Sequence, residues 1–250
     1  MTEKTKIIIC YHKETIIVKN EDVFIPIYVG KAIGEDDILE DIQGDDEGDN
    51  ISYKNKLYCE LTGLYWLWKN VDADNYGLFH YRRFLDIKNK YPETVPIHSI
   101  DLSDWSEESI SEEMENYDII LPVPMTMDMD VYEQYKICHV IEDFDVVLQI
   151  IKDDYPDFAT CLDGFLYQRD MCIGNVFIMK KALLNEYCTF LFDILGKAES
   201  KIDLSNRNSY QMRSLGFMAE RIFNIFIRHK IDANPDLKVK YVNLVMFNGI

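Results

Sequence analysis

The run Tyr76-Gly77-Leu78-Phe79-His80-Tyr81-Arg82-Arg83-Phe84 joins strand-forming residues to a group of cationic and imidazole side chains. Open α/β sheets bind ligands outside the carboxyl ends of their strands, and guanidinium groups bind phosphate oxygens in pairs. Arg82 and Arg83 therefore predict an anion site, with His80 as a candidate catalytic group. The alternative is that the arginines form weak surface ion pairs and that His80 is a hydrogen-bonded structural histidine.

A second polar cluster, Asp45-Asp46-Glu47-Gly48-Asp49-Asn50, lies in a segment rich in acidic residues. Its carboxylates could bind Mg²⁺, Mn²⁺ or Ca²⁺ through Asp45, Asp46 or Asp49, although the ligand spacing of an EF-hand loop is missing. Two other interpretations stay open. The aspartates could be solvated and stabilise the positive end of the next helix, or Asp49 and Asn50 could bind sugar hydroxyls.

Glu220 lies among apolar residues of an expected helix, including Phe217 and Phe223. A buried carboxylate needs a partner, which Arg213 or Arg221 could provide. Burial also raises the pKa of a carboxyl group and can make it a general base. Glu220 is therefore a candidate catalytic residue, and a salt bridge that anchors the helix is the alternative.

The overall composition excludes several classes of partner. The chain has 26 lysines and arginines against 44 aspartates and glutamates, a net charge of −18, which repels nucleic-acid phosphates.

The six cysteines of the chain include no C-x-x-C pair, which predicts reduced thiols. We expect no signal peptide, and the sequence contains no apolar run of the roughly 18 residues that span a membrane. We therefore expect a cytoplasmic protein, whose membrane association, if any, is peripheral and at the inner face.

Strand and helix patterns alternate along the chain. Strands are expected at residues 6–10, 23–29, 76–84, 118–122, 173–179 and 238–247, and helices at 50–70, 131–152, 182–198 and 209–230. Residues 34–50 are expected to form a surface loop, with Asn50 as the N-cap of the next helix. This alternation favours an α/β fold with a mostly parallel central sheet flanked by helices, in a single domain of residues 1–250.

Several common catalytic motifs are missing from the sequence. It contains no G-x-G-x-x-G after a strand, no G-x-x-x-x-G-K-[ST], no G-x-S-x-G and no H-E-x-x-H. This argues against a Rossmann dehydrogenase, a P-loop kinase, an α/β-hydrolase and a zincin. The five histidines are scattered and none is near a cysteine at a metal-binding spacing, so zinc is not expected.

Short segments spread over the chain, taken together, resemble one bacterial family. They are Cys10-Tyr11-His12-Lys13 and residues 24–32, 48–52, 58–70, 77–84, 118–122, 175–180 and 213–221. In this order, over about residues 7–230, they resemble domain of unknown function 4422. Its members are found among capsular and exopolysaccharide gene products and are regarded as glycosyltransferases.

The resemblance implies a GT-A-like, Rossmann-like fold that moves a sugar from a nucleotide diphosphate donor to an acceptor hydroxyl. Many such enzymes hold a divalent metal with a D-x-D motif, whereas the corresponding strand here ends in arginines. Arg82 and Arg83 would then stabilise the departing diphosphate without a metal. Mg²⁺ or Mn²⁺ held by the acidic loop is the alternative.

The resemblance also implies roles for other residues. It places nucleotide contacts at Tyr11-His12-Lys13, contacts to the donor ribose or sugar at Asp49 and Asn50, and the acceptor side at Asn175. Glu220 would deprotonate the acceptor hydroxyl if the reaction inverts configuration. In a retaining reaction no such base is required, and Glu220 would instead bind a sugar hydroxyl.

The expected donor is a UDP-sugar, with galactose in pyranose or furanose form as the first candidate. The expected acceptor is a growing surface polysaccharide or a lipid-linked oligosaccharide. An apolar or basic surface near the C-terminal helices would then face the membrane, with four arginines, Arg207, Arg213, Arg221 and Arg228. Two other functions stay open: a non-catalytic carbohydrate- or nucleotide-binding protein, and a nucleotide-sugar hydrolase.

Overall fold

A computed structural model of the chain describes residues 3–20, 22–34, 39 and 41–248. The main sheet is built from β1 (Thr5–Tyr11), β2 (Phe24–Tyr28), β3 (Gln43–Gly44), β4 (Asn75–His80), β7 (Ile119–Pro122), β10 (Phe177–Lys180) and β11 (Val239–Val242). The strands lie in the order β11-β7-β10-β4-β1-β2-β3. Neighbours are parallel except at β10, which is antiparallel to β4 and β7. The predicted mostly parallel sheet is confirmed.

Three short strands extend this sheet, and one of them divides the strand expected at residues 76–84, because β4 ends at His80 and an antiparallel strand begins at Arg83. They are β5 (Arg83–Leu85), β6 (Thr94–Pro96) and β12 (Leu244–Asn248). β12 is antiparallel to β5 and parallel to β6, so the end of the described chain lies beside the segment that follows β4. The expected final strand is therefore two strands, β11 and β12. A separate pair is formed by β8 (Met125–Thr126) and β9 (Asp170–Met171).

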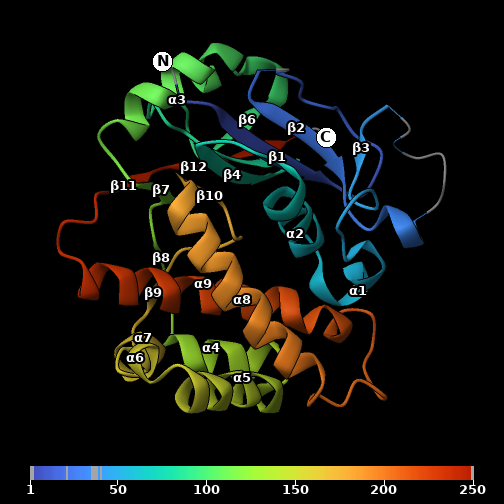
Figure 1. Cartoon of the computed structure of the whole chain (residues 1–250), viewed down its shortest axis with the longest axis vertical. Coiled ribbons are helices and arrows are strands. Elements are labelled where there is room, and N and C mark those ends of the chain that lie inside the picture. The colour runs from blue at the N-terminus through green and yellow to red at the C-terminus, as the bar shows by residue number, and fades with distance from the viewer. Residues whose placement is uncertain (1–2, 21, 35–38, 40, 249–250) are drawn as a thin grey trace.

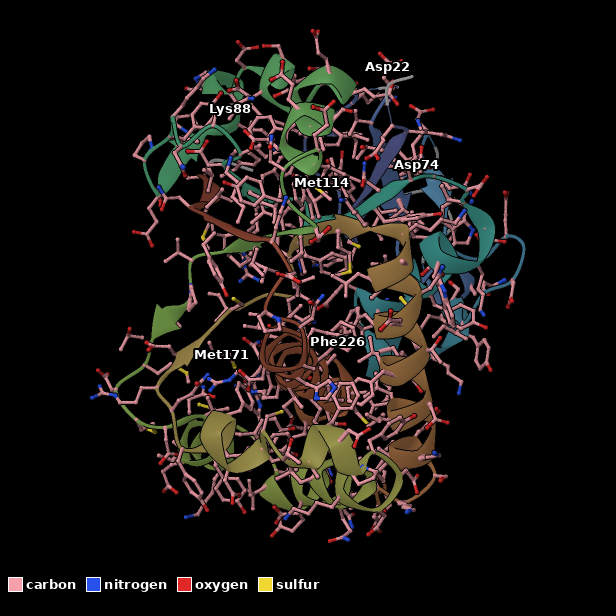
Figure 2. The ribbon with its side chains drawn as sticks, turned by 60° about the vertical axis from the view of Figure 1, so that its left-hand side comes forward. Asp22, Asp74, Lys88, Met114, Met171 and Phe226 are labelled. Atoms are coloured by element: carbon pink, nitrogen blue, oxygen red, sulfur yellow. The ribbon has the colours of Figure 1, made fainter. Side chains whose placement is uncertain are left out.

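Helices cover both faces of the sheet (Figure 1). On one face lies α3 (Glu107–Met114). Towards the other lie α1 (Asn55–Tyr58), α2 (Leu61–Asn70), α4 (Val131–Cys138), α5 (Ile141–Asp154), α6 (Pro156–Ala159), α7 (Leu162–Leu166), α8 (Lys181–Glu199) and α9 (Ser214–Ala233). Figure 2 shows Met114 of α3 and Phe226 of α9 on opposite sides of the sheet.

The alternation of side chains along β1 explains why both faces are covered. Ile7 and Ile9 belong to the apolar cluster under α3, whereas Ile8 and Cys10 belong to the larger cluster under the other helices. Successive residues of a strand point to opposite faces, so an unbroken apolar run needs cover on both sides. The helices satisfy this requirement.

The expected helix at residues 50–70 is broken at Cys59. A 3₁₀ turn at Ser52–Lys54 leads into α1, and Cys59 then adopts a φ of 53° before α2 begins. Asn50 does not cap a long helix, because its Oδ1 instead accepts the Ser52 backbone N–H within the preceding turn. The helix expected at residues 131–152 is also two helices, α4 and α5.

Parallel pairing brings the important strand ends to one edge of the sheet. Cys10 of β1 is in register with His80 of β4, so the segments after both strands leave the sheet together. β10 runs the other way, and residues Gly174 and Asn175 therefore approach its start at the same edge. Three segments that are far apart in the sequence meet there.

Candidate functional site

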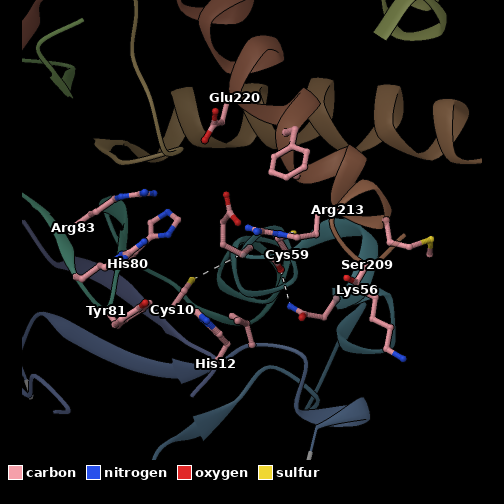
Figure 3. A pocket seen from close by; sticks show the side chains of 17 residues that line it. Cys10, His12, Lys56, Cys59, His80, Tyr81, Arg83, Ser209, Arg213 and Glu220 are labelled. Carbon is pink, nitrogen blue, oxygen red and sulfur yellow. Dashed lines mark hydrogen bonds between the residues drawn. The ribbon is translucent and has the colours of Figure 1, made fainter. Parts of the chain in front are cut away.

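A cavity of about 830 Å³ lies at this edge of the sheet (Figure 3). Strands β1 and β4 form one side, and the break before α2, the 3₁₀ turn Gln211–Arg213 and the start of α9 form the other. The lining side chains are Cys10, His12, Val29, Asn55, Lys56, Cys59, Glu60, His80, Tyr81, Arg82, Arg83, Ser209, Met212, Arg213, Phe217 and Glu220, with Gly216 between them.

Arg82 and Arg83 both line this cavity. Among the described residues, no carboxylate lies within 4.0 Å of either guanidinium group. The Arg83 Nε atom is buried without a hydrogen-bond partner in the same part of the chain. In a protein with a net charge of −18, unpaired arginines at a cavity leave their donors open to an anionic ligand.

His80 is held at the inner end of the cavity. Its Nε2 lies 2.6 Å from the Gly174 carbonyl oxygen. Because a carbonyl only accepts, Nε2 carries the proton of this hydrogen bond. Burial, and secondarily the nearby Arg83 charge, lowers the pKa of His80 to about 4, so the imidazole is neutral near pH 7. His80 is therefore a neutral donor that positions Gly174.

Glu220 faces the cavity from α9. One carboxylate oxygen accepts the Gly174 backbone N–H at 3.2 Å, and the other accepts from Nη1 of Arg221 at 3.1 Å. Arg221, rather than Arg213, is thus the partner that a buried glutamate requires. Burial raises the pKa of Glu220, and the Arg221 charge partly opposes this effect.

Glu60 is a cavity residue that the sequence motifs did not single out. It directly follows the break at Cys59, and its Oε1 accepts a hydrogen bond from Nδ2 of Asn175 at 2.8 Å. Burial raises the pKa of Glu60, and the Asn175 amide partly opposes this effect. The only signal in the sequence is a carboxylate inside an otherwise apolar helical run. Asn175 lies behind it and is 1% exposed.

Arg213 adds a third guanidinium group to the cavity wall. Figure 3 shows it across the cavity from Arg83 and His80. Its Nε donates to the Cys59 sulfur at 3.4 Å, and its guanidinium lies 5.1 Å from the centre of the Phe217 ring. Positive charge therefore lines two sides of the cavity.

The segment after β1 is only partly at the cavity. His12 lines it and packs edge-on against the Tyr81 ring, with the two ring centres 5.3 Å apart. The Lys13 ammonium lies 5.1 Å from the centre of the same ring. Tyr11 points into the core instead: it is fully buried, and its hydroxyl oxygen accepts the Val18 backbone N–H at 2.9 Å. This position does not allow the nucleotide stacking that we considered for Tyr11.

The acidic loop lies away from the cavity lining. Asp45 is fully buried, and its carboxylate accepts the backbone N–H groups of Gly30 and Lys31 and the Ser52 hydroxyl. One oxygen of Asp46 is buried without a partner among the described residues. Residues 35–38 and 40 of the expected loop lie outside those residues, within which no cluster of three possible metal ligands occurs.

Asp49 and Asn50 hold this loop in shape. Asp49 exchanges backbone hydrogen bonds with the Asn70 side chain at 3.0 and 2.8 Å and accepts from the Tyr65 hydroxyl at 3.2 Å. The Asn50 side chain donates to the backbone carbonyl of Asp46 at 2.9 Å. Neither residue lines the cavity. The contacts of Asp49 and Asn50 to a donor sugar stay a prediction.

The four C-terminal arginines do not form one basic surface. Arg221 is 3% exposed, and Arg213 lines the cavity. Arg207 pairs with Asp143 at 2.8 Å, and Arg228 pairs with Asp232 at 2.8 Å. These four arginines therefore do not supply the expected basic patch, and an apolar surface that faces the membrane stays a prediction. Within the described residues, no helix is both long and apolar enough to cross a membrane.

A solved structure resembles this chain closely. It is described as the WbbM bifunctional glycosyltransferase in its apo form, and it matches with a TM-score of 0.89 and 32% sequence identity. The match covers 98% of this chain but 46% of the other, so this chain spans about half the length of that protein. No curated protein sequence matches this chain closely enough to count as a relative.

The family comparison covers most of the cavity-forming elements. The model for the domain of unknown function DUF4422 matches residues 6–231, which include β4, β10, all but the first residue of β1 and most of α9. This agrees with the resemblance that we found over about residues 7–230. The chain belongs to the DUF4422 family.

Proposed function

We propose that this protein is a glycosyltransferase that moves a sugar from a nucleoside diphosphate to a hydroxyl group of a saccharide. The observation that carries the proposal is the cavity itself, because Arg82, Arg83 and Arg213 line it together with the carboxylates of Glu60 and Glu220. A cavity of about 830 Å³ is in the usual range for ligands of this size. The similarity to a bifunctional glycosyltransferase supports the same reaction class.

The arginines would act on the leaving group. When the bond between the anomeric carbon and the diphosphate breaks, negative charge grows on the phosphate oxygens. Preorganised guanidinium donors stabilise this charge without a reorganisation cost at the moment of reaction. Arg83 suits this role because its Nε is buried and lacks a partner within the described chain. Arg82 is exposed and lines the same cavity, so its guanidinium group can contact the diphosphate as the donor enters.

We further propose that the arginines, rather than the acidic loop, supply this charge stabilisation. A divalent cation needs carboxylate oxygens that are free to bind it. The Asp45 carboxylate is already occupied by Gly30, Lys31 and the Ser52 hydroxyl. It fastens the loop after β2 and does not fit a metal ligand.

Our first candidate donor is UDP-galactose, in pyranose or furanose form, and our candidate acceptor is a surface polysaccharide or lipid-linked oligosaccharide. The proposal is tested by incubating the protein with each donor, with and without saccharide acceptors, and measuring UDP release and glycoside formation. Release that an acceptor stimulates, with formation of a glycoside, is the expected result. Release that no acceptor changes would indicate a hydrolase, and binding without release would indicate a binding protein.

A further inference from the structure

The two carboxylates of the cavity have different partners. The negative charge of Glu220 is compensated by Arg221, with which it forms an ion pair at 3.1 Å. Its other carboxylate oxygen accepts the Gly174 N–H. Glu60 accepts from the neutral amide of Asn175 at 2.8 Å. In the part of the chain that the structure describes, no cationic group lies within 4.0 Å of Glu60. Glu60 is thus the carboxylate that is free to take a proton.

The basicity of the two groups follows from these partners. Burial raises the pKa of both carboxyl groups. For Glu220 the largest opposing cause is the Arg221 charge, whereas for Glu60 it is the hydrogen bond from Asn175. A general base works best when its pKa approaches the pH of the reaction, so a buried carboxylate without a paired cation is the better candidate.

Unusual backbone geometry holds Glu60 in place. Cys59, which precedes Glu60, has a φ of 53°, and Asn175, which holds its carboxylate, has a φ of 50°. Residues other than glycine rarely adopt this region, and such positions persist where the surrounding structure enforces them, often at functional sites. The Asn175 amide orientation follows from its partner, because a carboxylate can only accept. Two separate irregular positions therefore fix one carboxylate at the cavity.

We propose that Glu60 is the catalytic base that takes the proton of the acceptor hydroxyl, and that Glu220 is a positioning residue acting through Gly174. This inference rests on the proposed glycosyltransferase function. Gly174 joins the two parts of the site, since its N–H is held by Glu220 and its carbonyl by His80.

The acceptor oxygen forms a bond to the anomeric carbon on the face opposite the diphosphate, while the bond from that carbon to the diphosphate oxygen breaks. The electron pair of the broken bond leaves with the nucleoside diphosphate, which Arg82 and Arg83 hold. The acceptor proton moves to the Glu60 carboxylate. The product glycoside has the inverted configuration, as a single displacement requires.

The test compares Glu60→Gln with Glu220→Gln at saturating donor and acceptor. A glutamine at position 60 can still accept from Asn175, so the fold should survive, and a thermal melt checks this. We expect Glu60→Gln to lower kcat by about 10²–10⁴-fold and to leave the donor Kd within about threefold. We expect Glu220→Gln to lower kcat by about tenfold or less, because it acts through Gly174.

The pH profile separates a base from a structural carboxylate. In the wild type and in Glu220→Gln, kcat should fall at low pH as Glu60 becomes protonated, whereas the residual rate of Glu60→Gln should lack this fall. The proton-accepting role is overturned if Glu60→Gln keeps kcat within tenfold of wild type, if Glu220→Gln alone removes the low-pH limb, or if the product retains configuration. A wild type without any transfer would overturn the proposed function itself, whereas a fully active Glu60→Gln beside an active wild type overturns only the role of Glu60.

Discussion

His80 illustrates how one neutral side chain can organise the site. It donates to the Gly174 carbonyl at 2.6 Å, and Glu220 accepts the N–H of the same glycine at 3.2 Å. Gly174 has a φ of 83°, a conformation that glycine adopts without strain. Side chains of the cavity thus hold both the backbone N–H and the backbone carbonyl of Gly174. This fixes the course of the chain into the next residue, Asn175.

The lowered pKa of His80 predicts a pH-dependent stability. An unfolded histidine titrates near 6.5, whereas folded His80 titrates at about 4, so between these values only the unfolded state binds the proton. The free energy of unfolding should therefore fall as the pH falls through this window. This fall should be steeper in wild type than in His80→Gln, and the two slopes should differ by up to about 1.4 kcal/mol per pH unit. Urea denaturation across the window measures this, and parallel pH dependences would contradict it.

At the scale of single residues, the sequence predicts positions better than it predicts contacts. His80, Arg82 and Arg83 reach one cavity because strand ends of a parallel sheet gather at one edge, and Glu220 reaches it from α9. Glu60 could not be predicted, since its direction depends on the local break of the helix before it. Nor could the occupied carboxylates of Asp45 and Asp49, because tertiary folding brings their partners near: backbone N–H groups and the Ser52 hydroxyl for Asp45, and the Tyr65 hydroxyl for Asp49.

At the scale of elements, β4 is packed so closely that one added methyl group should matter. A Cβ at Gly77 would lie 2.8 Å from Cγ1 of Ile7 on β1 and 3.0 Å from the Phe177 carbonyl oxygen on β10. The backbone oxygen cannot move without disturbing the strand pairing. We expect Gly77→Ala to lower the free energy of unfolding by about 1–3 kcal/mol, measured by urea denaturation.

Gly164 provides the matched control for Gly77. It lies in α7, and nothing comes within 4 Å of a Cβ placed there. Gly164→Ala should leave stability unchanged or raise it by up to about 1 kcal/mol, because alanine favours a helix and restricts the unfolded chain. Equal losses in the two variants would show that close packing at β4 is not the cause.

The helices and strands differ in how well the sequence pattern predicts them. The apolar runs of β1, β2, β4 and β7 identify them as strands. The helix breaks at Cys59 and His139 were missed because the apolar periodicity continues across them. Strands β5 and β6 have three residues each, too few for a pattern of their own. β5 pairs with both β4 and the distant β12, and β6 pairs with β12.

At the scale of the whole molecule, the excess of negative charge should oppose the compact state. With a net charge of −18, folding brings like charges together, and salt screens that repulsion. If screening recovers about 1 kcal/mol, Tm should rise by about 2–4 °C between low salt and about 0.3 M NaCl. KCl at the same concentration should raise Tm by a similar amount. A fall in Tm in both salts would mean that attractive ion pairs outweigh the repulsion.

The most direct measurement is calorimetric titration of UDP into the wild type, Arg82→Ala, Arg83→Ala and the control Arg228→Ala. Arg228 is exposed and paired with Asp232 away from the cavity, so its loss removes the same charge without touching the site. We predict that Arg82→Ala and Arg83→Ala each bind UDP at least about tenfold more weakly than wild type, whereas Arg228→Ala binds it equally well. Equal affinities in all four proteins, or no binding by the wild type, would contradict a diphosphate site at these arginines.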